Sequence, residues 1–467
     1  MHFSQVKILL VAAGAVHLTN AHTTFTNFFV DGVDQGDGTA VRMSNNIQQA
    51  TYPLPNVTTP DMACGVNGET GVARIASVNA GSRLTFEYRA VPDVSTVSGG
   101  VSIDPNHKGP CAIYMKKVTD SSASNNAAGD GWFKIMEDGY DSVAGKWCTE
   151  KLIPNDGHLS ATVPSDLAPG YYLVRPELLA LHQADKTPPD PQFYVGCAQI
   201  FLNSSGSATP PNTVAIPGYV NMSTSAMTYD IWTVPLKLPF PDFGPPLYTG
   251  SSSKRSIEAR AMNQTIGLKP EGCVMENVNW CGFMPASYTD QSSCYQTSQN
   301  CSVQATDCYN AAGPTGSKNC FNWEDFCTAI HDDCGSSLSC SGPPSISSYM
   351  PGSLERLDQS KVAAASGPMP SSASLSGSNP AAPMQSYGAE PASAPPSAVI
   401  PGSSRLTGYI TDTGSLPTNG SIDMCGSKGD QTCAEELCYT AVYPTITAAR
   451  GANHNSGNVL EAPRTRG

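Results

Sequence analysis

Phe193-Tyr194-Val195-Gly196-Cys197-Ala198-Gln199-Ile200-Phe201-Leu202 is a short, largely apolar run rich in aromatic and branched residues, a composition typical of buried β-strands. Runs of the same kind precede it along the chain: Thr24–Val30, Arg83–Tyr88, Cys111–Val118 and Tyr171–Val174. Turn-forming stretches such as Asn155-Asp156-Gly157 separate these runs. Helical periodicity is sparse between residues 22 and 250. Residues 22–250 are therefore predicted to form an all-β domain, built as a two-sheet sandwich with long connecting loops.

The charge and length of the chain limit what it can bind. The 467 residues carry a formal net charge of −13, and only 14% of them are charged. An acidic, charge-poor surface disfavours nucleic acids and anionic membranes as partners, whereas it is compatible with a neutral polymer such as a polysaccharide. No apolar run is long enough for a transmembrane helix. A chain of this length is expected to contain more than one domain.

Residues 1–21 have the features of an export signal. Lys7 precedes an apolar run, residues 8–16, that is too short to span a membrane, and Thr19 and Ala21 fit a small-residue cleavage site. Cleavage after Ala21 would make His22 the first residue. A terminal histidine carries a free α-amino group and an imidazole, which together can close a chelate ring around a metal ion. The alternative is a first residue without functional significance.

Cysteines and glycosylation motifs indicate the same compartment. Sixteen cysteines behind an export signal predict disulfides formed outside the reducing cytosol. Six Asn-x-Ser/Thr motifs agree with secretion and surface glycosylation: Asn56, Asn203, Asn221, Asn263, Asn300 and Asn419. The protein is therefore predicted to be secreted and extracellular.

Composition changes divide the rest of the chain. Residues 251–262 are predicted to be a Ser-rich, basic linker, and residues 263–340 a cysteine-rich module with nine of the sixteen cysteines. Seven-residue steps between these cysteines indicate helical segments joined by disulfides, and the absence of paired C-x-x-C motifs disfavours a zinc cluster. Residues 341–404 are predicted to be a disordered Ser/Pro/Ala-rich spacer. Residues 405–467 form a tail with three cysteines. Because the module and the tail both contain an odd number of cysteines, nine and three, one disulfide is predicted to join them.

Few histidines are available as metal ligands. His107 lies in a turn-forming run before the predicted strand Cys111–Val118, where it is either aimed at a site or an ordinary solvated loop residue. His182 is followed by Gln192 and Tyr194, whose side chains would share one face of a strand because strand side chains alternate. These three residues form either a shared polar site or, in the case of the last two, an ordinary polar strand face.

Six motifs follow one another over residues 22–250. They are His22-Thr23-Thr24-Phe25, Asp61-Met62-Ala63-Cys64, His107-Lys108-Gly109-Pro110, Trp132-Phe133-Lys134-Ile135, Asp190-Pro191-Gln192-Phe193-Tyr194 with Cys197, and Gly244-Pro245-Pro246-Leu247-Tyr248. Together they resemble the fungal lytic polysaccharide monooxygenases of auxiliary-activity family 9. The resemblance implies an immunoglobulin- or fibronectin III-like sandwich and a monomeric copper enzyme. It also implies oxidative cleavage of cellulose or a related β-1,4-glucan at carbon 1 or carbon 4, with an external electron donor and O2 or H2O2.

The resemblance implies a copper site made from three of these residues. His22 would contribute its amino group and ring, His107 its ring, and Tyr194 the axial position of one copper ion. Imidazole and amine nitrogens in a tetragonal set suit Cu(II). His182 and Gln192 match the pair that would orient the reacting oxygen species, so these two residues and Tyr194 are the candidate catalytic residues.

The resemblance also implies a substrate contact and two disulfides. Trp232 matches a position that often stacks on sugar rings; a partly buried core tryptophan is the alternative. Cys64 and Cys197 match the common disulfide of the family. Cys111 and Cys148 then pair by elimination within the domain.

Two features depart from the family pattern. Glu87-Tyr88-Arg89 stands where many members have a tryptophan, and residues 91–103 are divergent, which leaves the substrate contacts near His107 undefined.

No pair of carboxylates stands out as it would in a glycoside hydrolase. A non-catalytic copper-binding or cell-wall polysaccharide-binding protein on the same fold is the alternative function. The set of His182, Gln192 and Tyr194 favours the enzyme, because copper storage does not require it.

Overall fold

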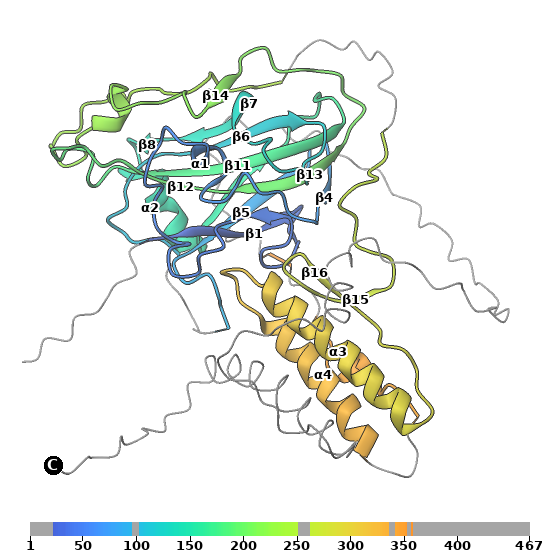
Figure 1. Ribbon diagram of the computed structural model, residues 1–467. Coiled ribbons are helices and arrows are strands. Elements are labelled where there is room, and N and C mark those ends of the chain that lie inside the picture. The colour runs from blue at the N-terminus through green and yellow to red at the C-terminus, as the bar shows by residue number, and fades with distance from the viewer. Residues whose placement is uncertain (1–21, 96–101, 251–261, 336–340, 353–355, 358–467) are drawn as a thin grey trace, which may run out of the picture. The chain divides into compact units, whose positions relative to one another are not determined.

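The computed structural model describes residues 22–95, 102–250, 262–335, 341–352 and 356–357 (Figure 1). The predicted export signal, most of the linker 251–262, the later part of the spacer and the tail lie outside these residues, and so does the predicted disulfide between tail and module. Among the helices within the described ranges, none is long and apolar enough to cross a membrane.

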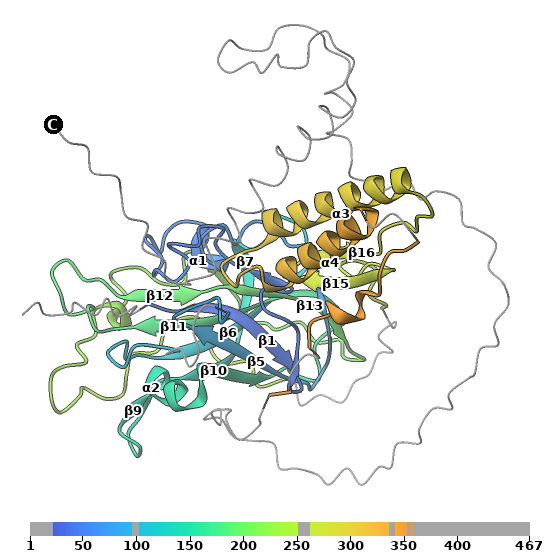
Figure 2. The same cartoon turned by 90° about the horizontal axis from the view of Figure 1, so that it is seen from below.

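Residues 22–250 form a β-sandwich, which confirms the predicted fold class (Figure 1). The smaller sheet has four strands in the order β10-β5-β1-β2. Its strands are β1 (Thr24–Val30), β2 (Val33–Asp34), β5 (Arg83–Arg89) and β10 (His158–Thr162). Seen from below, β1 and β5 run side by side, with Phe28 of β1 opposite Phe86 of β5 (Figure 2).

The larger sheet has eight strands, six of them in the order β14-β7-β6-β11-β13-β3. These six are β3 (Val41–Arg42), β6 (Cys111–Val118), β7 (Gly129–Asp138), β11 (Gly170–Ala180), β13 (Cys197–Asn203) and β14 (Val214–Ile216). Two strands lie off this path: β4 (Ala76–Asn79) pairs with β13, and β12 (Gln192–Val195) pairs with β11.

The central strand β11 shows why the larger sheet is apolar on both faces. All of its residues are buried, from Gly170 to Ala180. Val174 and its neighbours on one face pack into the core between the two sheets, together with Phe86 of the smaller sheet. Leu173 on the other face packs into a second cluster that contains Trp132 and loop residues such as Tyr229. A strand covered on both sides loses the alternation of apolar and polar residues, and this explains the long apolar runs in the sequence.

The loops of the sandwich contain several short helices, turns and a small hairpin. They are the helices α1 (Asp61–Cys64) and α2 (Cys148–Leu152), the hairpin of β8 (Tyr140–Asp141) and β9 (Lys146–Trp147), and two 3-10 turns, Ile153–Asn155 and Ser225–Thr228. The disulfide Cys111–Cys148 joins the start of β6 to α2, and Cys64–Cys197 joins α1 to the start of β13. Both bridges therefore tie loop-borne helices to the larger sheet.

The cysteine-rich module consists of a hairpin and two long helices. The hairpin is β15 (Cys273–Asn277) with β16 (Trp280–Phe283), and the helices are α3 (Gln291–Ala311) and α4 (Lys318–Gly335). The helices lie side by side in both views (Figures 1 and 2). Three disulfides join them: Cys294–Cys334, Cys301–Cys327 and Cys308–Cys320. The seven-residue cysteine steps thus place one sulfur on the same side of α3 at every second turn.

Ordered elements continue past residue 340, where the predicted spacer begins. The backbone of Gly342 exchanges hydrogen bonds with Tyr288, and a 3-10 turn spans Ile346–Ser348. The ring of Tyr349 lies 5.5 Å from that of Phe326. Arg356 forms an isolated bridge with Val33 of β2. The aromatic contact with α4 explains why a segment with a spacer-like composition is ordered here.

Candidate functional site

His22, His107 and Tyr194 come together although they are far apart in the sequence. His22 lies two residues before the start of β1, His107 lies in the loop before β6, and Tyr194 belongs to β12. The ring centroids of His22 and His107 are 6.0 Å apart, and that of Tyr194 lies 6.4 Å from the first and 5.7 Å from the second. The hydroxyl of Tyr88, in β5, donates a hydrogen bond to the Tyr194 carbonyl and so ties the two sheets together beneath the site.

His107 is the most buried histidine of this group. His107 is only 5% exposed, and neither ring nitrogen has a hydrogen-bond partner among the residues that the structure describes. The nearest carboxylate oxygen, of Asp104, lies 3.8 Å from Nδ1, which is too far for a hydrogen bond. Burial and the neighbouring His182 lower the pKa of His107 to about 4. The ring is therefore neutral at pH 5–7, and one of its two nitrogens is unprotonated and can bind a metal ion.

The ring of His182 lies next to that of His107 and is tilted by 37° against it. The two ring centroids are 4.3 Å apart, and Nδ1 of His182 is buried with no hydrogen-bond partner in the described part of the chain. Burial lowers the pKa of His182, and Asp190 and Asp104 partly oppose this effect. The structure thus brings His182 next to His107, which itself neighbours His22, and burial keeps the His182 ring neutral near pH 7.

Tyr194 and Gln192 share one face of β12, as the alternation of a strand predicts. The Tyr194 hydroxyl donates a hydrogen bond of 2.8 Å to Gln192 Oε1, and Gln192 Nε2 donates to Asp190. Tyr194 is only 3% exposed and packs into the core between the sheets, whereas Phe193 packs into the outer cluster. Both faces of β12 are therefore largely buried. Burial also raises the pKa of Tyr194, so that its hydroxyl stays protonated.

Two aromatic side chains extend from this site to the surface. Trp232 is 47% exposed, and its Nε1 donates a hydrogen bond of 3.2 Å to the carbonyl of His182. Tyr52 is 57% exposed, and its ring centroid lies 5.0 Å from that of His22. Tyr52 was not among the residues singled out from the sequence. Its only signal was an aromatic residue in a polar loop, because the loop 44–54 returns to His22 only in the folded protein.

The donor set contains two imidazoles and a phenol. No group of three or more His, Cys, Asp or Glu side chains with metal-binding geometry occurs in the described part of the chain. A metal ion held between His22 and His107 would therefore need a further ligand of another kind. The α-amino group of His22 is such a ligand if His22 is the first residue of the mature protein.

Comparisons with known proteins identify the family of the chain. The family model of Auxiliary Activity family 9 (formerly GH61) matches residues 22–238, a match that starts at His22. The chain is 48% identical over 356 residues to AA9 family lytic polysaccharide monooxygenase H of Botryotinia fuckeliana, a match covering 74% of this chain and 80% of the relative. It is also 48% identical over 347 residues to monooxygenase C of the same family from Aspergillus tamarii, covering 73% and 91%.

A solved structure, CvAA9A, is 33% identical to this chain. The superposition covers 49% of this chain and 98% of that structure, with a TM-score of 0.44. The two sequence matches above extend well beyond the length of the family model, and they are long enough to include part of the cysteine-rich module.

Proposed function

The chain belongs to Auxiliary Activity family 9, the lytic polysaccharide monooxygenases, and we propose that it is a secreted copper enzyme that cleaves cellulose or a related β-1,4-glucan at carbon 1 or carbon 4. Membership of the family makes it an oxidoreductase that breaks polysaccharide chains. The observation that carries the finer proposal is that His22 and His107 lie close together and that both ring nitrogens of His107 are buried with no hydrogen-bond partner among the described residues.

The site fits a copper ion. His107 offers a neutral ring whose nitrogens lack protein partners, and an unsatisfied buried polar group of this kind is costly unless something binds it. His22 would provide its ring nitrogen and amino nitrogen, and the Tyr194 hydroxyl would be a further ligand. Nitrogen ligands of this type favour copper over the other divalent first-row metals.

The proposal requires processing after Ala21. Only then does His22 carry a free amino group, whose ordinary pKa of about 7.7–8.0 makes it easier to deprotonate for a metal than a lysine amine. The start of the family match at residue 22 supports this cleavage position. Secretion is supported by the six disulfides of the described residues, since such bonds persist in oxidising compartments.

Residues around the histidines would control the chemistry. Bound copper would supply one-electron oxygen chemistry, using an external electron donor with O2 or H2O2. Gln192 accepts the Tyr194 hydroxyl proton in a hydrogen bond and thereby fixes the direction of the phenol oxygen. His182 is a neutral ring whose centroid lies 4.3 Å from that of His107, and it could donate or accept a hydrogen bond within the site. These are the candidate catalytic residues His182, Gln192 and Tyr194.

The substrate is proposed to lie across the exposed aromatic rings. Trp232 and Tyr52 are about half exposed and both neighbour a site histidine, through a hydrogen bond to His182 and a ring contact with His22. Flat aromatic rings pack against the apolar faces of sugar rings, and a protein of low charge does not repel a neutral glucan. The protein would act as a monomer, without nucleic acid or membrane partners.

The test is mass analysis of the products formed from cellulose by the correctly processed, copper-loaded protein with ascorbate. We expect oligosaccharides oxidised to aldonic acids or 4-keto sugars, and these also identify the attacked carbon. A matched control has one extra residue before His22, which turns the amino nitrogen into an amide. The control should lose most of its copper affinity and its products. Tight copper binding without any product from cellulose would instead favour another polysaccharide or the non-catalytic copper-binding alternative.

A further inference from the structure

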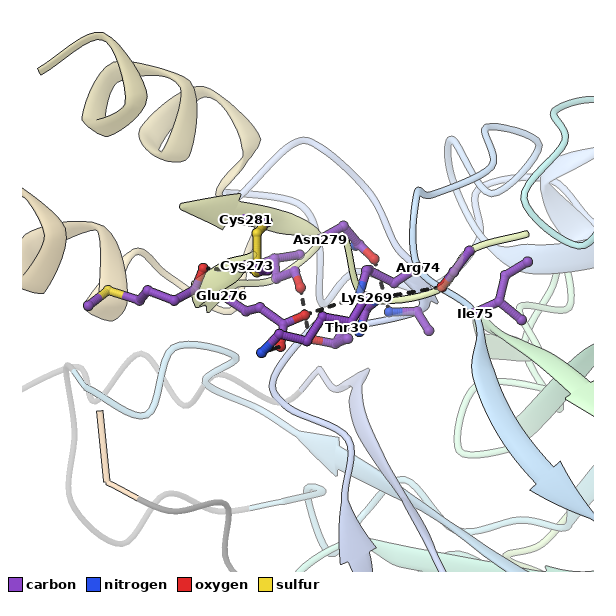
Figure 3. Close-up of polar contacts among 12 residues, drawn as sticks. Thr39, Arg74, Ile75, Lys269, Cys273, Glu276, Asn279 and Cys281 are labelled. Carbon is purple, nitrogen blue, oxygen red and sulfur yellow. Dashed lines mark hydrogen bonds and ion pairs between the residues drawn. A yellow bond between two sulfur atoms is a disulfide. The ribbon is translucent and has the colours of Figure 1, made fainter. Parts of the chain in front are cut away.

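Hydrogen bonds join a turn of the sandwich to the hairpin of the cysteine-rich module (Figure 3). Thr39 Oγ1 donates a hydrogen bond of 2.8 Å to the carbonyl of Val278. The side chain of Asn279 makes two bonds to the same turn: Oδ1 accepts from the Ala40 amide at 3.0 Å, and Nδ2 donates to the Gly38 carbonyl at 3.1 Å. One amide side chain thus satisfies a donor and an acceptor of the backbone, which makes its orientation specific.

An ion-pair cluster forms the second contact (Figure 3). Arg74 Nε, just before β4, lies 3.1 Å from Glu276 Oε1 in β15, and Lys269 Nζ lies 2.9 Å from the other carboxylate oxygen. The side chains of Arg74 and Glu276 are only 15% and 28% exposed. The pair is therefore better shielded from water and salt than an ordinary surface ion pair.

The segment that leads into the module covers the edge of the larger sheet. The Ile75 amide donates a hydrogen bond of 2.9 Å to the Gly267 carbonyl, and Gln264 Nε2 donates one of 3.0 Å to the Ile75 carbonyl. The Ile266 amide donates to the hydroxyl of Tyr171 at 3.1 Å. These bonds pair backbone groups next to β4 that would otherwise face solvent, which is one way in which proteins protect sheet edges.

Two glycines allow the backbones to approach this closely. Gly38 and Gly267 both have a φ of +69°, where other residues are strained. A Cβ atom on Gly38 would lie 2.9 Å from Thr315 Oγ1 and 2.9 Å from Val278 Cγ1. On Gly267 it would lie 2.3 Å from Ile75 Cγ1. The two surfaces therefore match in shape as well as in charge.

The contacted turn is connected to the candidate copper site. Residues 36–40 lead directly into β3, and β3 is followed by the loop 44–54 that carries Tyr52 next to His22. The Ala40 carbonyl accepts a hydrogen bond from the Gln199 amide in β13, so that the turn is also tied to the larger sheet. A movement of this turn can therefore shift the loop that carries Tyr52 beside His22.

We propose that the cysteine-rich module is a built-in partner that docks on this edge of the sandwich and, by holding residues 36–42, positions the Tyr52 loop beside His22. The docking stands on the contacts themselves, whereas its effect on catalysis rests on the proposed function. The module then restricts the movement of residues 36–42 in the catalytic domain. A freely tethered sugar-binding unit would not need the paired charges or the close glycine contacts.

The docking is tested by cutting the chain between the two parts. A specific protease site is placed within residues 251–262 of the full chain, and the cleaved protein is analysed by size-exclusion chromatography without reductant. The four cysteines of the sandwich are bonded to one another, so no described disulfide holds the parts together. We expect the cleaved parts to elute together at micromolar concentration. Separate elution of the cleaved parts would overturn the docking.

A double variant and a matched control identify the surface. Asn279→Ala with Glu276→Gln removes the amide bonds and the charge pair, and the cleaved parts should then separate. The control, Asn310→Ala with Glu271→Gln, makes the same chemical changes at exposed positions of the module and should leave them together. Co-elution of the double variant, or separation of the control, would contradict the assigned surface.

The positioning effect is measured on the uncut double variant. Hydrogen exchange of the amides of residues 36–43 should be at least ten-fold faster, with the amides of β11 unchanged, and the yield of oxidised products should fall several-fold with copper still bound. Unchanged exchange or an unchanged yield would overturn the positioning role. If the unmodified protein forms no oxidised products, the proposed function fails, while the chromatography result still decides the docking.

Discussion

The sandwich and the cysteine-rich module differ in what holds them together. The sandwich buries two large clusters of apolar side chains and has two disulfides over residues 22–250. The described part of the module buries one cluster of ten residues, four of them cysteines, and has four disulfides within a much shorter segment. A short segment exposes a larger share of its surface and cannot build a sufficient apolar core. Disulfides therefore supply the stability that the small core of the module lacks.

The sandwich encloses its buried charges more completely than the described part of the module does. Inside the sandwich, Arg42 is only 1% exposed, and burial lowers its pKa to about 10. It donates hydrogen bonds to three backbone carbonyls, of Gly68, Ser121 and Ala123, and to two side chains. In the helical part of the module, Glu324 is 9% exposed and accepts a hydrogen bond from Tyr309. A large core can thus enclose a charge when every donor is satisfied.

Loss of the buried arginine should have the largest effect, and it should affect the sandwich. We expect Arg42→Met to lower the free energy of unfolding by about 4 kcal/mol, because carbonyl and amide oxygens are left buried without donors. Urea unfolding would measure the loss of stability, and hydrogen exchange of the backbone amides would locate it in the larger sheet. Lys146→Met, at an exposed position, should change stability by less than about 0.5 kcal/mol. A loss below about 1 kcal/mol for Arg42→Met would show that the network is dispensable.

Loss of a disulfide should be nearly as large, but it should affect the module. Replacing Cys301 and Cys327 by alanine opens a bridge with a sequence separation of 26, which is expected to cost about 3 kcal/mol. Because the module has a small core, this loss should abolish the protection of α3 and α4 against hydrogen exchange. The same change at Cys111 and Cys148 should leave the sandwich folded. A module that stays protected would contradict the view that cross-links replace its core.

Acid should weaken the metal-free sandwich by a smaller amount. Burial lowers the pKa of His107 to about 4, so the folded protein binds this proton less readily than the unfolded chain, with its pKa near 6.5. Stability is then fully present above about pH 6.5 and falls as the pH is lowered towards 4, by roughly 2–3 kcal/mol. Thermal unfolding with a chelator present would measure this slope. His107→Gln should flatten it; an unchanged slope would assign the effect to other groups.

The smallest effect concerns where the substrate binds. Trp232→Ala should weaken binding to cellulose about five-fold, or roughly 1 kcal/mol, because it removes an exposed ring next to the proposed copper site. Phe283→Ala removes an aromatic ring that is 43% exposed in the module and should have no effect. Binding isotherms on cellulose compare the two. A larger effect at Phe283 would move the binding surface to the module.

Most of the larger pattern could be predicted from residues near one another in the sequence. The apolar runs around Tyr171 and Phe193 indicated strands, and the cysteine steps between 294 and 334 indicated linked helices, because both periodicities are local. The ordered segment that includes Tyr349 was predicted to be part of a spacer. Its order depends on an aromatic contact with Phe326, which composition does not reveal.

The candidate site was only partly accessible to the same reasoning. The alternation of a strand placed Gln192 and Tyr194 on one side, and their hydrogen bond follows from it. The burial of His107 could not be inferred, because an ordinary solvated loop residue would have the same local sequence. Tyr52 was missed for a related reason: nothing in the loop 44–54 shows that it returns to His22.

The sequence by itself determined the class of fold, the family and the cysteine-rich module, because strand patterns, motifs and cysteine spacing are properties of short segments. The tertiary structure alone decided that the ring nitrogens of His107 lack protein partners, that Tyr52 lies beside His22, and that the module contacts the edge of the sandwich. Each of these depends on contacts between segments that are distant in the chain, and such contacts form only when the two sheets and the loops around them pack together.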